Sequence, residues 1–581
     1  MTEDIQESNH LSDGKSAGAY TTAAKTGLSW LEMICITILF LLLYLPFINK
    51  AFHIDDYCFI KLSGMTGWNP LQAFPINYDY SGGILPNVLP YDTTHPFLVP
   101  YFIKIVIALF GENETTLHLA FMIFPLIALF SLMKLNTVFF PGSRRIALIL
   151  GVFFCTLPAF LVNAQNIMTD VPTLAFLLLA MAGFFDGLEN GTRGMTWLGS
   201  AALTMAIFTS YQMVVFVPLL FLYALWRRKL NLPVAVAIIS PVLVLLAWLL
   251  AVYAKYDYFP VIKSKLSGKE GNVADVIRAG HSRTAMIKKI FDFFAFLGAA
   301  MIWVTPLHYA LKKRMGTFLV LFLTLLLACL PAAYALTGYP FMSNVFLSAL
   351  VALGLLTIAT LVSKVRQRRK EPGKEYELFL LFWLFSVIGY YIALLPWCSA
   401  RYLLPAFPPA LMLLLNDPAW SFSTRARRIG LSCVLCGAVL FAFASAYSDY
   451  RLADSYRDFA VKTKALLRAN GGNAFNVWYI GDWGMHYYMD RAGARYLHAD
   501  STEPMRGDYV VVPEMPRLWY PSLQVQKRLS LFYNMSYRSR LPLRLFNGRS
   551  HAGFYSHGWG MLPFAFSSEP DEVFLVFEVV R

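Results

Sequence analysis

The sequence predicts an α-helical polytopic membrane protein with about thirteen transmembrane helices, followed by a small soluble α/β domain. Three observations lead to this fold class. Of the 581 residues, 57% are hydrophobic and 14% are charged, which is more apolar material than one water-soluble core can bury. The apolar residues form blocks of about 20, long enough to cross a bilayer as helices. After residue 447 these blocks give way to short strand-like runs.

The first block, residues 28–49, makes a helix of about 33 Å at about 1.5 Å per residue, enough for a hydrocarbon core of about 30 Å. A cleaved signal peptide is the weaker interpretation, because Pro46–Lys50 offers no small-residue cleavage site. Residues 1–27 are polar, and we expect them to form a disordered cytosolic tail.

The remaining predicted spans are apolar runs separated by polar loops. Together with the first they are 28–49, 115–135, 146–163, 168–188, 195–211, 213–226, 232–254, 287–310, 316–336, 344–363, 376–396, 401–415 and 428–447. With the amino terminus in the cytosol, every cytosolic loop is net basic or contains an Arg, as the positive-inside rule requires. An odd number of spans places the carboxyl terminus outside.

One apolar stretch, residues 96–110, is not counted as a span. It is short, carries Lys104 near its middle, and would move Arg144–Arg145 to the outer face if it crossed. We expect it to form a helix at the outer interface. The exterior loop 51–114 is therefore predicted to be a structured cap, since it is long and rich in turn residues.

A second exterior loop, residues 255–286, is basic on the face where the rule predicts no basic excess. Its cations include Lys255, Lys263 and Lys265. Such a surface attracts anions. Contact with anionic lipid headgroups and closure over a substrate phosphate are equally open interpretations.

Residues 448–581 are predicted to be an exterior α/β domain, so that residues 28–447 form the transmembrane domain. A helix-like stretch at 452–470 precedes strand-like runs at 476–480, 509–512 and 573–577. The aromatic run Trp483–Tyr488 is interpreted as core, although it could also stack on sugar rings.

Several functional classes are not indicated. The seven cysteines form no disulfide framework and no zinc-site spacing, and the chain has no phosphate-binding glycine loop or dinucleotide fingerprint. The net charge of +14 is explained by the membrane topology, so no nucleic-acid partner is implied.

The candidate chemistry begins with Asp55 and Asp56, directly beyond the first span. An acidic pair at a membrane surface is costly unless it binds a cation, accepts a proton or faces water. The alternative for Asp55 is a cap on the helix that follows. Asp170 could likewise start a helix ahead of Pro172, and Arg401 could extend to lipid headgroups.

These residues lie in motifs that carry a family resemblance. The motifs are Phe52–Asp56, Thr94–Phe97, Phe110–Glu114, Gln165–Pro172 and Ala400–Pro405. In order, spacing and placement on the outer face, the chain resembles the multispan GT-C glycosyltransferases that take sugars from polyprenyl phosphates. This group includes protein O-mannosyltransferases and the lipid A aminoarabinose transferases.

The resemblance implies roles for the acids. It makes Asp55 the general base and Asp56 a group that orients the acceptor or the base. Many relatives have Asp-Glu where this chain has Asp-Asp. Asp170 would help to shape the site, and in some relatives this second acid binds a divalent metal with the first. A metal ion at Asp55 and Asp170 is therefore left open, and no other cofactor is implied.

The resemblance also assigns the cations. Arg401 is expected to hold the donor phosphate, with His95, Lys255, Lys263 and Lys265 as weaker candidates. His95 could instead begin the interfacial helix.

The implied reaction moves a sugar from a polyprenyl-phosphate donor to an acceptor hydroxyl on a lipid, glycan or protein. It would be an inverting displacement at the outer, periplasmic face of a bacterial inner membrane, within the cell envelope. The alternative is a lipid-linked sugar transporter or flippase, whose sites lie at mid-membrane in repeated, discontinuous helices. The ionisable residues collect at the outer face, which favours the enzyme.

Overall fold

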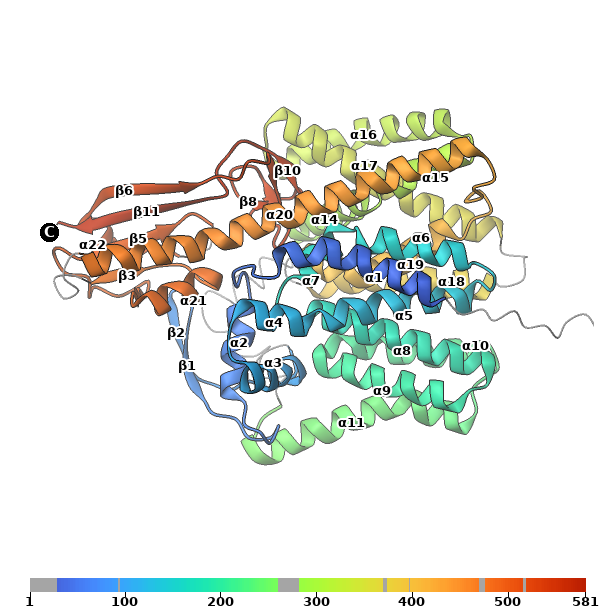
Figure 1. Ribbon diagram of the computed structural model, residues 1–581, viewed down its shortest axis with the longest axis horizontal. Coiled ribbons are helices and arrows are strands. Elements are labelled where there is room, and N and C mark those ends of the chain that lie inside the picture. The colour runs from blue at the N-terminus through green and yellow to red at the C-terminus, as the bar shows by residue number, and fades with distance from the viewer. Residues whose placement is uncertain are drawn as a thin grey trace, which may run out of the picture.

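The computed structural model describes residues 29–91, 95–259, 282–368, 374–395, 398–469, 476–515 and 519–580. A helical bundle forms one end of an elongated molecule and a sheet-containing domain forms the other (Figure 1). Most of the predicted basic loop, including Lys263 and Lys265, lies outside the described residues.

The predicted spans all coincide with helices or with pairs of consecutive helices. The bundle helices are α1 (Trp30–Tyr44), α4 (Glu114–Phe121), α5 (Ile123–Phe139), α6 (Arg144–Cys155), α7 (Pro158–Ala164), α8 (Asp170–Asn190), α9 (Arg193–Thr209), α10 (Phe216–Trp226), α11 (Leu232–Tyr256), α14 (Arg283–Ala300), α15 (Val304–Leu311), α16 (Met315–Thr337), α17 (Phe341–Gln367), α18 (Lys374–Leu394), α19 (Phe407–Leu415) and α20 (Arg425–Ala469). Among the described residues, eight spans are long and apolar enough to cross a membrane, or ten if each of two bent pairs counts as one. The length and composition of these helices alone therefore support fewer spans than the predicted number of about thirteen.

Glycines allow the central helices to pack backbone to backbone. A Cβ atom on Gly183 of α8 would lie 2.8 Å from the Gly199 nitrogen of α9. A Cβ atom on Gly298 of α14 would lie 1.9 Å from the Leu350 oxygen of α17. Close approach through small residues is the usual way in which helices associate in lipid. The Gly183 contact holds α8, which begins at Asp170, directly against α9.

The predicted cap is a folded unit between the bundle and the sheet domain. It consists of α2 (Asp56–Met65), a hairpin of β1 (Ile76–Tyr80) and β2 (Gly83–Val88), and α3 (Leu98–Phe110). The hairpin tip docks on the carboxyl-terminal domain: Gly82 adopts φ +81° against Trp519, and its oxygen accepts the Ala499 amide at 2.7 Å. The stretch predicted at the interface is helical, as α3, and its depth in a membrane stays a prediction.

The carboxyl-terminal domain has a five-stranded mixed sheet in the order β4-β3-β5-β11-β6. The strands are β3 (Val477–Tyr479), β4 (Arg495–Tyr496), β5 (Tyr509–Pro513), β6 (Leu529–Tyr537) and β11 (Glu572–Val579). The three predicted strand runs are confirmed by β3, β5 and β11. The aromatic run lies in α21 (Trp483–Ala492), most of which is buried, so the core interpretation is confirmed.

The two parts of the molecule share one helix. The 45-residue helix α20 leaves the bundle and continues along the sheet (Figure 1). There Phe459 stacks on Phe574 of β11 at a ring distance of 4.1 Å. The predicted boundary at 447/448 therefore lies inside a continuous helix, which couples the domains mechanically.

Candidate active site

Three of the predicted site residues meet, from segments far apart in the sequence. Arg401, in the 3₁₀ helix Ala400–Ala406, places Nη1 2.7 Å from Oδ2 of Asp55 and 4.0 Å from Oδ2 of Asp170. The side chains of Asp55, Arg401 and Asp170 are 27%, 10% and 12% exposed, so Asp55 is the member most open to solvent. One cation is thus shared by two carboxylates in a mostly buried setting.

The capping alternatives do not fit this geometry. Asp55 stands at the N-cap of α2 and makes no side-chain cap hydrogen bond. Asp170 is the first residue inside α8, whose N-cap is Thr169. Asp55 therefore binds Arg401 and does not cap a helix, whereas Asp170 contacts Arg401 and also interacts with its own backbone amide in the first turn of α8.

The guanidinium of Arg401 is held on several sides. Nη2 lies 3.3 Å from the Tyr402 hydroxyl, and Nη1 lies 2.9 Å from the Met168 sulfur. The buried Nε–H of Arg401 has no hydrogen-bond partner among the described residues. A buried donor without a partner costs free energy.

Asp56 points away from Arg401 and binds the backbone. Its oxygens accept the amides of His53 at 2.8 Å and Ile167 at 2.7 Å. Burial raises the pKa of Asp56 to about 7, against the opposing effects of Lys50 and the two amides. Asp56 therefore ties the segment that carries Asp55 to the segment that carries Asp170, which is a positioning role.

The backbone beside Asp55 is strained. Ile54 has a φ of +49°, a left-handed conformation that is unfavourable for a β-branched residue. Such strain persists only where the surroundings fix the chain, and it occurs often at functional sites. Here the hydrogen bond between Asp56 and the His53 amide closes the strained turn.

His95, one of the weaker phosphate-binding candidates, lies near Asp170 and Arg401. Its Nδ1 atom lies 3.1 Å from the Thr169 hydroxyl. Burial lowers the pKa of His95, and Arg401 acts in the same direction against Asp170, so its imidazole is neutral near pH 7. It is suited to hydrogen bonding and not to serve as a phosphate-binding cation.

Lys255 is not brought to the cluster. It is exposed in the last turn of α11, where its ammonium lies 5.6 Å from the Tyr256 ring centre. Lys263 and Lys265 lie outside the described residues, so their predicted role stays a prediction.

Sequence reasoning missed the contribution of the carboxyl-terminal domain. Asp482, next to α21, accepts hydrogen bonds from the Ser81 amide and the Tyr496 hydroxyl, both at 3.0 Å. Burial raises the pKa of Asp482 to about 6, and the charge of Asp55 acts in the same direction. Burial and the charge of Asp55 also raise the pKa of Tyr80 on the hairpin. Asp482 and Tyr80 thus feel the charge of Asp55, and no local pattern in the sequence indicates this.

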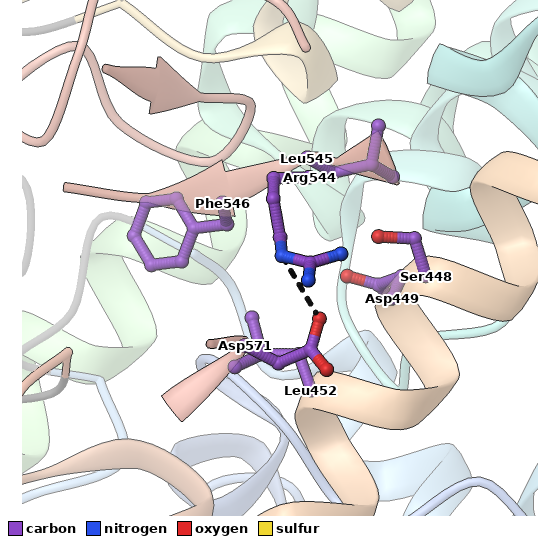
Figure 2. Close-up of a pocket in the computed structure, with 7 residues that line it drawn as sticks. All are labelled: Ser448, Asp449, Leu452, Arg544, Leu545, Phe546 and Asp571. Atoms are coloured by element: carbon purple, nitrogen blue, oxygen red, sulfur yellow. Dashed lines mark ion pairs between the residues drawn. The ribbon is translucent and has the colours of Figure 1, made fainter. Parts of the chain in front are cut away.

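A buried polar network supports the site from behind. Lys50 bonds to both Asp449 of α20 and Asn166. The Tyr555 hydroxyl donates to Asp449 at 3.0 Å and accepts from Asn166 at 2.9 Å. This network joins α20, the segments that lead to Asp55 and Asp170, and the carboxyl-terminal domain. On its far side, the Arg544–Asp571 ion pair at 3.3 Å closes a hollow that has no space for a bound molecule (Figure 2).

A divalent metal between Asp55 and Asp170 does not fit this arrangement. The position between the two carboxylates belongs to the guanidinium of Arg401, which already supplies the compensating charge. No step described below uses a metal at this site.

The comparisons with known proteins come from sequence and from structure. Residues 94–253 match the family model described as dolichyl-phosphate-mannose-protein mannosyltransferase. This stretch contains His95 and Asp170, whereas Asp55 and Arg401 lie outside it. No curated protein matches the whole sequence at a significant level.

Two solved proteins resemble the structure. ArnT from Cupriavidus metallidurans bound to undecaprenyl phosphate is 13% identical, with a TM-score of 0.41 over 86% of this chain and 95% of that chain. The Archaeoglobus fulgidus oligosaccharyltransferase in complex with Zn and sulfate is 11% identical, with a TM-score of 0.45 over 83% of this chain and 67% of that chain. The sequence match therefore relates residues 94–253 to the dolichyl-phosphate-mannose-protein mannosyltransferases, and the described residues include at least eight helices long and apolar enough to cross a membrane.

Proposed function

We propose that the protein transfers a sugar from a polyprenyl-phosphate donor to an acceptor hydroxyl, with Asp55 as general base and Arg401 as the phosphate-binding cation. The cluster of Arg401 with Asp55 and Asp170 carries this proposal. The donor class follows the description of the matching family, whose members are named for a dolichyl-phosphate sugar. The donor sugar and the acceptor, whether lipid, glycan or protein, are not specified by these residues.

The reaction needs one proton acceptor and one site of positive charge. Asp55 takes the proton of the acceptor hydroxyl, and the acceptor oxygen forms a bond to the anomeric carbon. The bond from that carbon to the phosphate oxygen breaks, and the lipid phosphate leaves with the bonding electrons. A single displacement of this kind inverts the anomeric configuration.

Arg401 would act mainly on the transition state. The phosphodiester of the donor carries one negative charge, and the departing lipid phosphate carries up to two. A fixed guanidinium therefore binds the developing charge more strongly than the ground state, which is the condition for faster chemistry. The unpaired Nε–H of Arg401 is the donor available for this additional charge.

The ion pair also suggests an order of binding. Without donor, Arg401 is paired with Asp55 at 2.7 Å, so the carboxylate is engaged by the cation. A donor phosphate shares the guanidinium and frees Asp55 as a base. Asp170 keeps Arg401 in place during this exchange. Donor binding would thus precede productive acceptor binding.

The proposed site faces the periplasm of a bacterial inner membrane. The positive-inside rule places the amino terminus in the cytosol and the cap with the carboxyl-terminal domain outside. A lipid-linked donor would then enter from the outer leaflet, and membrane lipids are the natural surroundings of the bundle.

The test is release of the lipid phosphate. Purified protein would be incubated with a panel of radiolabelled polyprenyl-phosphate sugars and candidate acceptors. We expect acceptor-dependent release with one donor, loss of release in Asp55→Asn, and normal release in the control Asp257→Asn, an exposed left-handed position that tolerates Asn. Unchanged release in Asp55→Asn would contradict the assignment of the base. Movement of the donor across vesicles without release would instead identify a flippase.

A further inference from the structure

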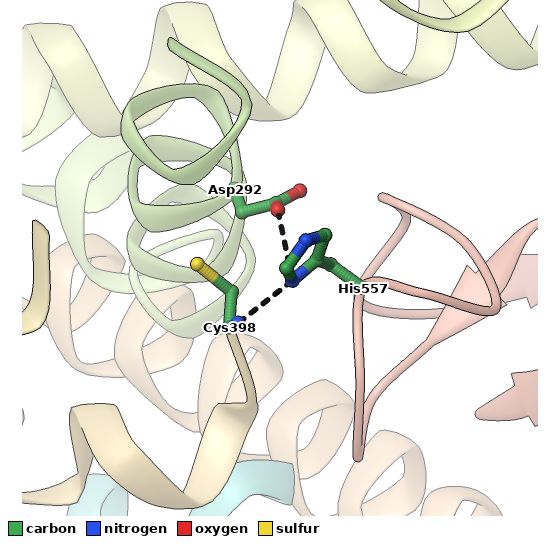
Figure 3. A group of neighbouring side chains, drawn as sticks. All are labelled: Asp292, Cys398 and His557. Carbon is green, nitrogen blue, oxygen red and sulfur yellow. Dashed lines mark hydrogen bonds and ion pairs between the residues drawn. The ribbon is translucent and has the colours of Figure 1, made fainter. Parts of the chain in front are cut away.

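We propose that Asp292, Cys398 and His557 form a binding site for a divalent transition metal of the zinc class, which joins the bundle to the carboxyl-terminal domain. One ligand atom from each residue lies within 4.8 Å of the others. Asp292 comes from α14, Cys398 from the segment before Arg401, and His557 from a loop of the carboxyl-terminal domain (Figure 3). This inference is independent of the proposed reaction.

The strongest indication is the carboxylate of Asp292. The side chain is fully buried, and neither of its oxygens has a hydrogen-bond partner among the described residues. A buried, unpaired carboxylate costs several kcal/mol, so such groups are normally paired or bound to a metal. The carboxylate lies beside His557 (Figure 3), whose Nδ1 atom lies 4.0 Å from Oδ2.

The ligand set suits zinc. Zinc accepts thiolate sulfur, imidazole nitrogen and carboxylate oxygen in a tetrahedral arrangement. Metal–ligand bonds of about 2.0–2.3 Å require ligand atoms about 3.3–3.8 Å apart, so the observed group must contract by roughly 1 Å. Cys398 is buried and the side chain of His557 is 17% exposed, which leaves a route for the ion and for a water as fourth ligand.

The imidazole is in the required protonation state. Nδ1 of His557 accepts the backbone amide of Cys398 at 2.7 Å, so Nδ1 carries no proton. A metal ligand needs this unprotonated nitrogen. Binding of the ion exchanges the amide hydrogen bond for a metal bond through a small turn of the ring.

The site would fix the segment that leads to Arg401. The Cys398 oxygen already accepts the His557 amide at 3.0 Å, and the Ala400 amide donates to Phe554 at 2.9 Å. A metal bonded to Cys398 and His557 would replace the third tie, the Cys398 amide hydrogen bond to Nδ1, by a stronger one between this segment and the carboxyl-terminal domain. The ion is therefore assigned a structural role. Its ligand Cys398 lies three residues before Arg401, so the ion would hold the segment that carries the guanidinium.

The test uses the full-length protein after removal of metal with a chelator. Titration of the wild type with Co²⁺ should give one bound ion per chain and a thiolate-to-cobalt absorption band, which Zn²⁺ should abolish. Cys398→Ser should lose the band, and His557→Gln should lower the affinity at least tenfold. The control replaces the exposed pair Cys433 and Cys436 of α20 by serine, and it should keep the band.

Thermal unfolding supplies a second readout. Zn²⁺ should raise the unfolding temperature of the wild type and of the control, but not that of Asp292→Asn. The proposal is overturned if wild-type protein shows no thiolate band with Co²⁺, or if the band survives in Cys398→Ser. It is also overturned if the band disappears in the control. The wild-type titration decides the matter even if a variant fails to fold.

Discussion

If Asp55 and Arg401 act as one unit, replacing both should cost little more activity than replacing one. The perturbations are Asp55→Asn, Arg401→Gln and the combination, measured as initial rates of lipid-phosphate release. Loss of a general base lowers rates by about 10²–10⁴. Loss of a charge-stabilising donor lowers them by about 10²–10³.

The structure indicates why these losses should not multiply. Opposite unit charges 4 Å apart interact by about 4 kcal/mol at an effective dielectric constant of 20, and this pair is at 2.7 Å. Solvent reaches Asp55, which is 27% exposed, so the net contribution is smaller than this figure. Arg401→Gln leaves Asp55 and Asp170 facing each other without a cation, and adding Asp55→Asn removes the charge repulsion between them.

We therefore expect the double variant to fall within about tenfold of the slower single variant, as for catalytic groups that act as a unit. Losses that multiply, so that the double variant is slower than the slower single variant by about 10² or more, would refute the reasoning, because they would mean that the two residues act independently. Arg401→Lys serves as a control for charge: it keeps the cation but loses the planar fork, and should retain part of the rate. Unfolding temperatures of all variants separate loss of function from loss of structure.

Three further predictions concern the support of the site. Asp56→Asn should lower the stability by about 1–3 kcal/mol, because the two backbone amides bind different oxygens of Asp56 and Asn replaces one of these oxygens by an NH2 donor. Asp55→Asn should leave the unfolding temperature nearly unchanged. Burial lowers the pKa of His53 to about 3, so the folded protein binds fewer protons than the unfolded chain below pH 6.5. The free energy of unfolding should therefore fall by up to about 5 kcal/mol on acidification from pH 6.5 toward 3. The unfolding temperature of His53→Gln should depend less on pH over this range. Gly484→Ala places a Cβ atom 2.3 Å from the Phe52 oxygen and should cost about 1–3 kcal/mol in thermal unfolding, unlike Gly389→Ala, where nothing lies within 4 Å. Equal effects of the two alanine substitutions would contradict the close contact between α21 and the catalytic segment.

The sequence allowed the helices and part of the site to be predicted, for a physical reason. A membrane requires long apolar helices and favours basic residues in the cytosolic loops, and both features can be read from the sequence. The helices therefore coincide with the predicted spans. Asp55, Asp170 and Arg401 lie at or near the ends of such spans, and the predicted topology places all three on the outer side of the membrane. The structure shows that they are in contact.

The remaining features depend on contacts between distant segments. No local pattern distinguishes Asp55, which binds Arg401, from Asp56, which binds two amides. The same holds for Asp482, which reaches the site only through the docked hairpin. Cysteine spacing likewise indicated no metal site, because Cys398 would share its ion with an acid in α14 and a histidine in the last part of the chain.

The most direct test of the account is a structure of the protein in complex with its polyprenyl-phosphate sugar, or with the lipid phosphate and a bound acceptor. We expect phosphate oxygens within hydrogen-bond distance of the Arg401 guanidinium, with Asp55 on the opposite side of the anomeric carbon and next to the acceptor hydroxyl. A phosphate bound away from Arg401, with the Asp55–Arg401 ion pair undisturbed, would contradict the central claim.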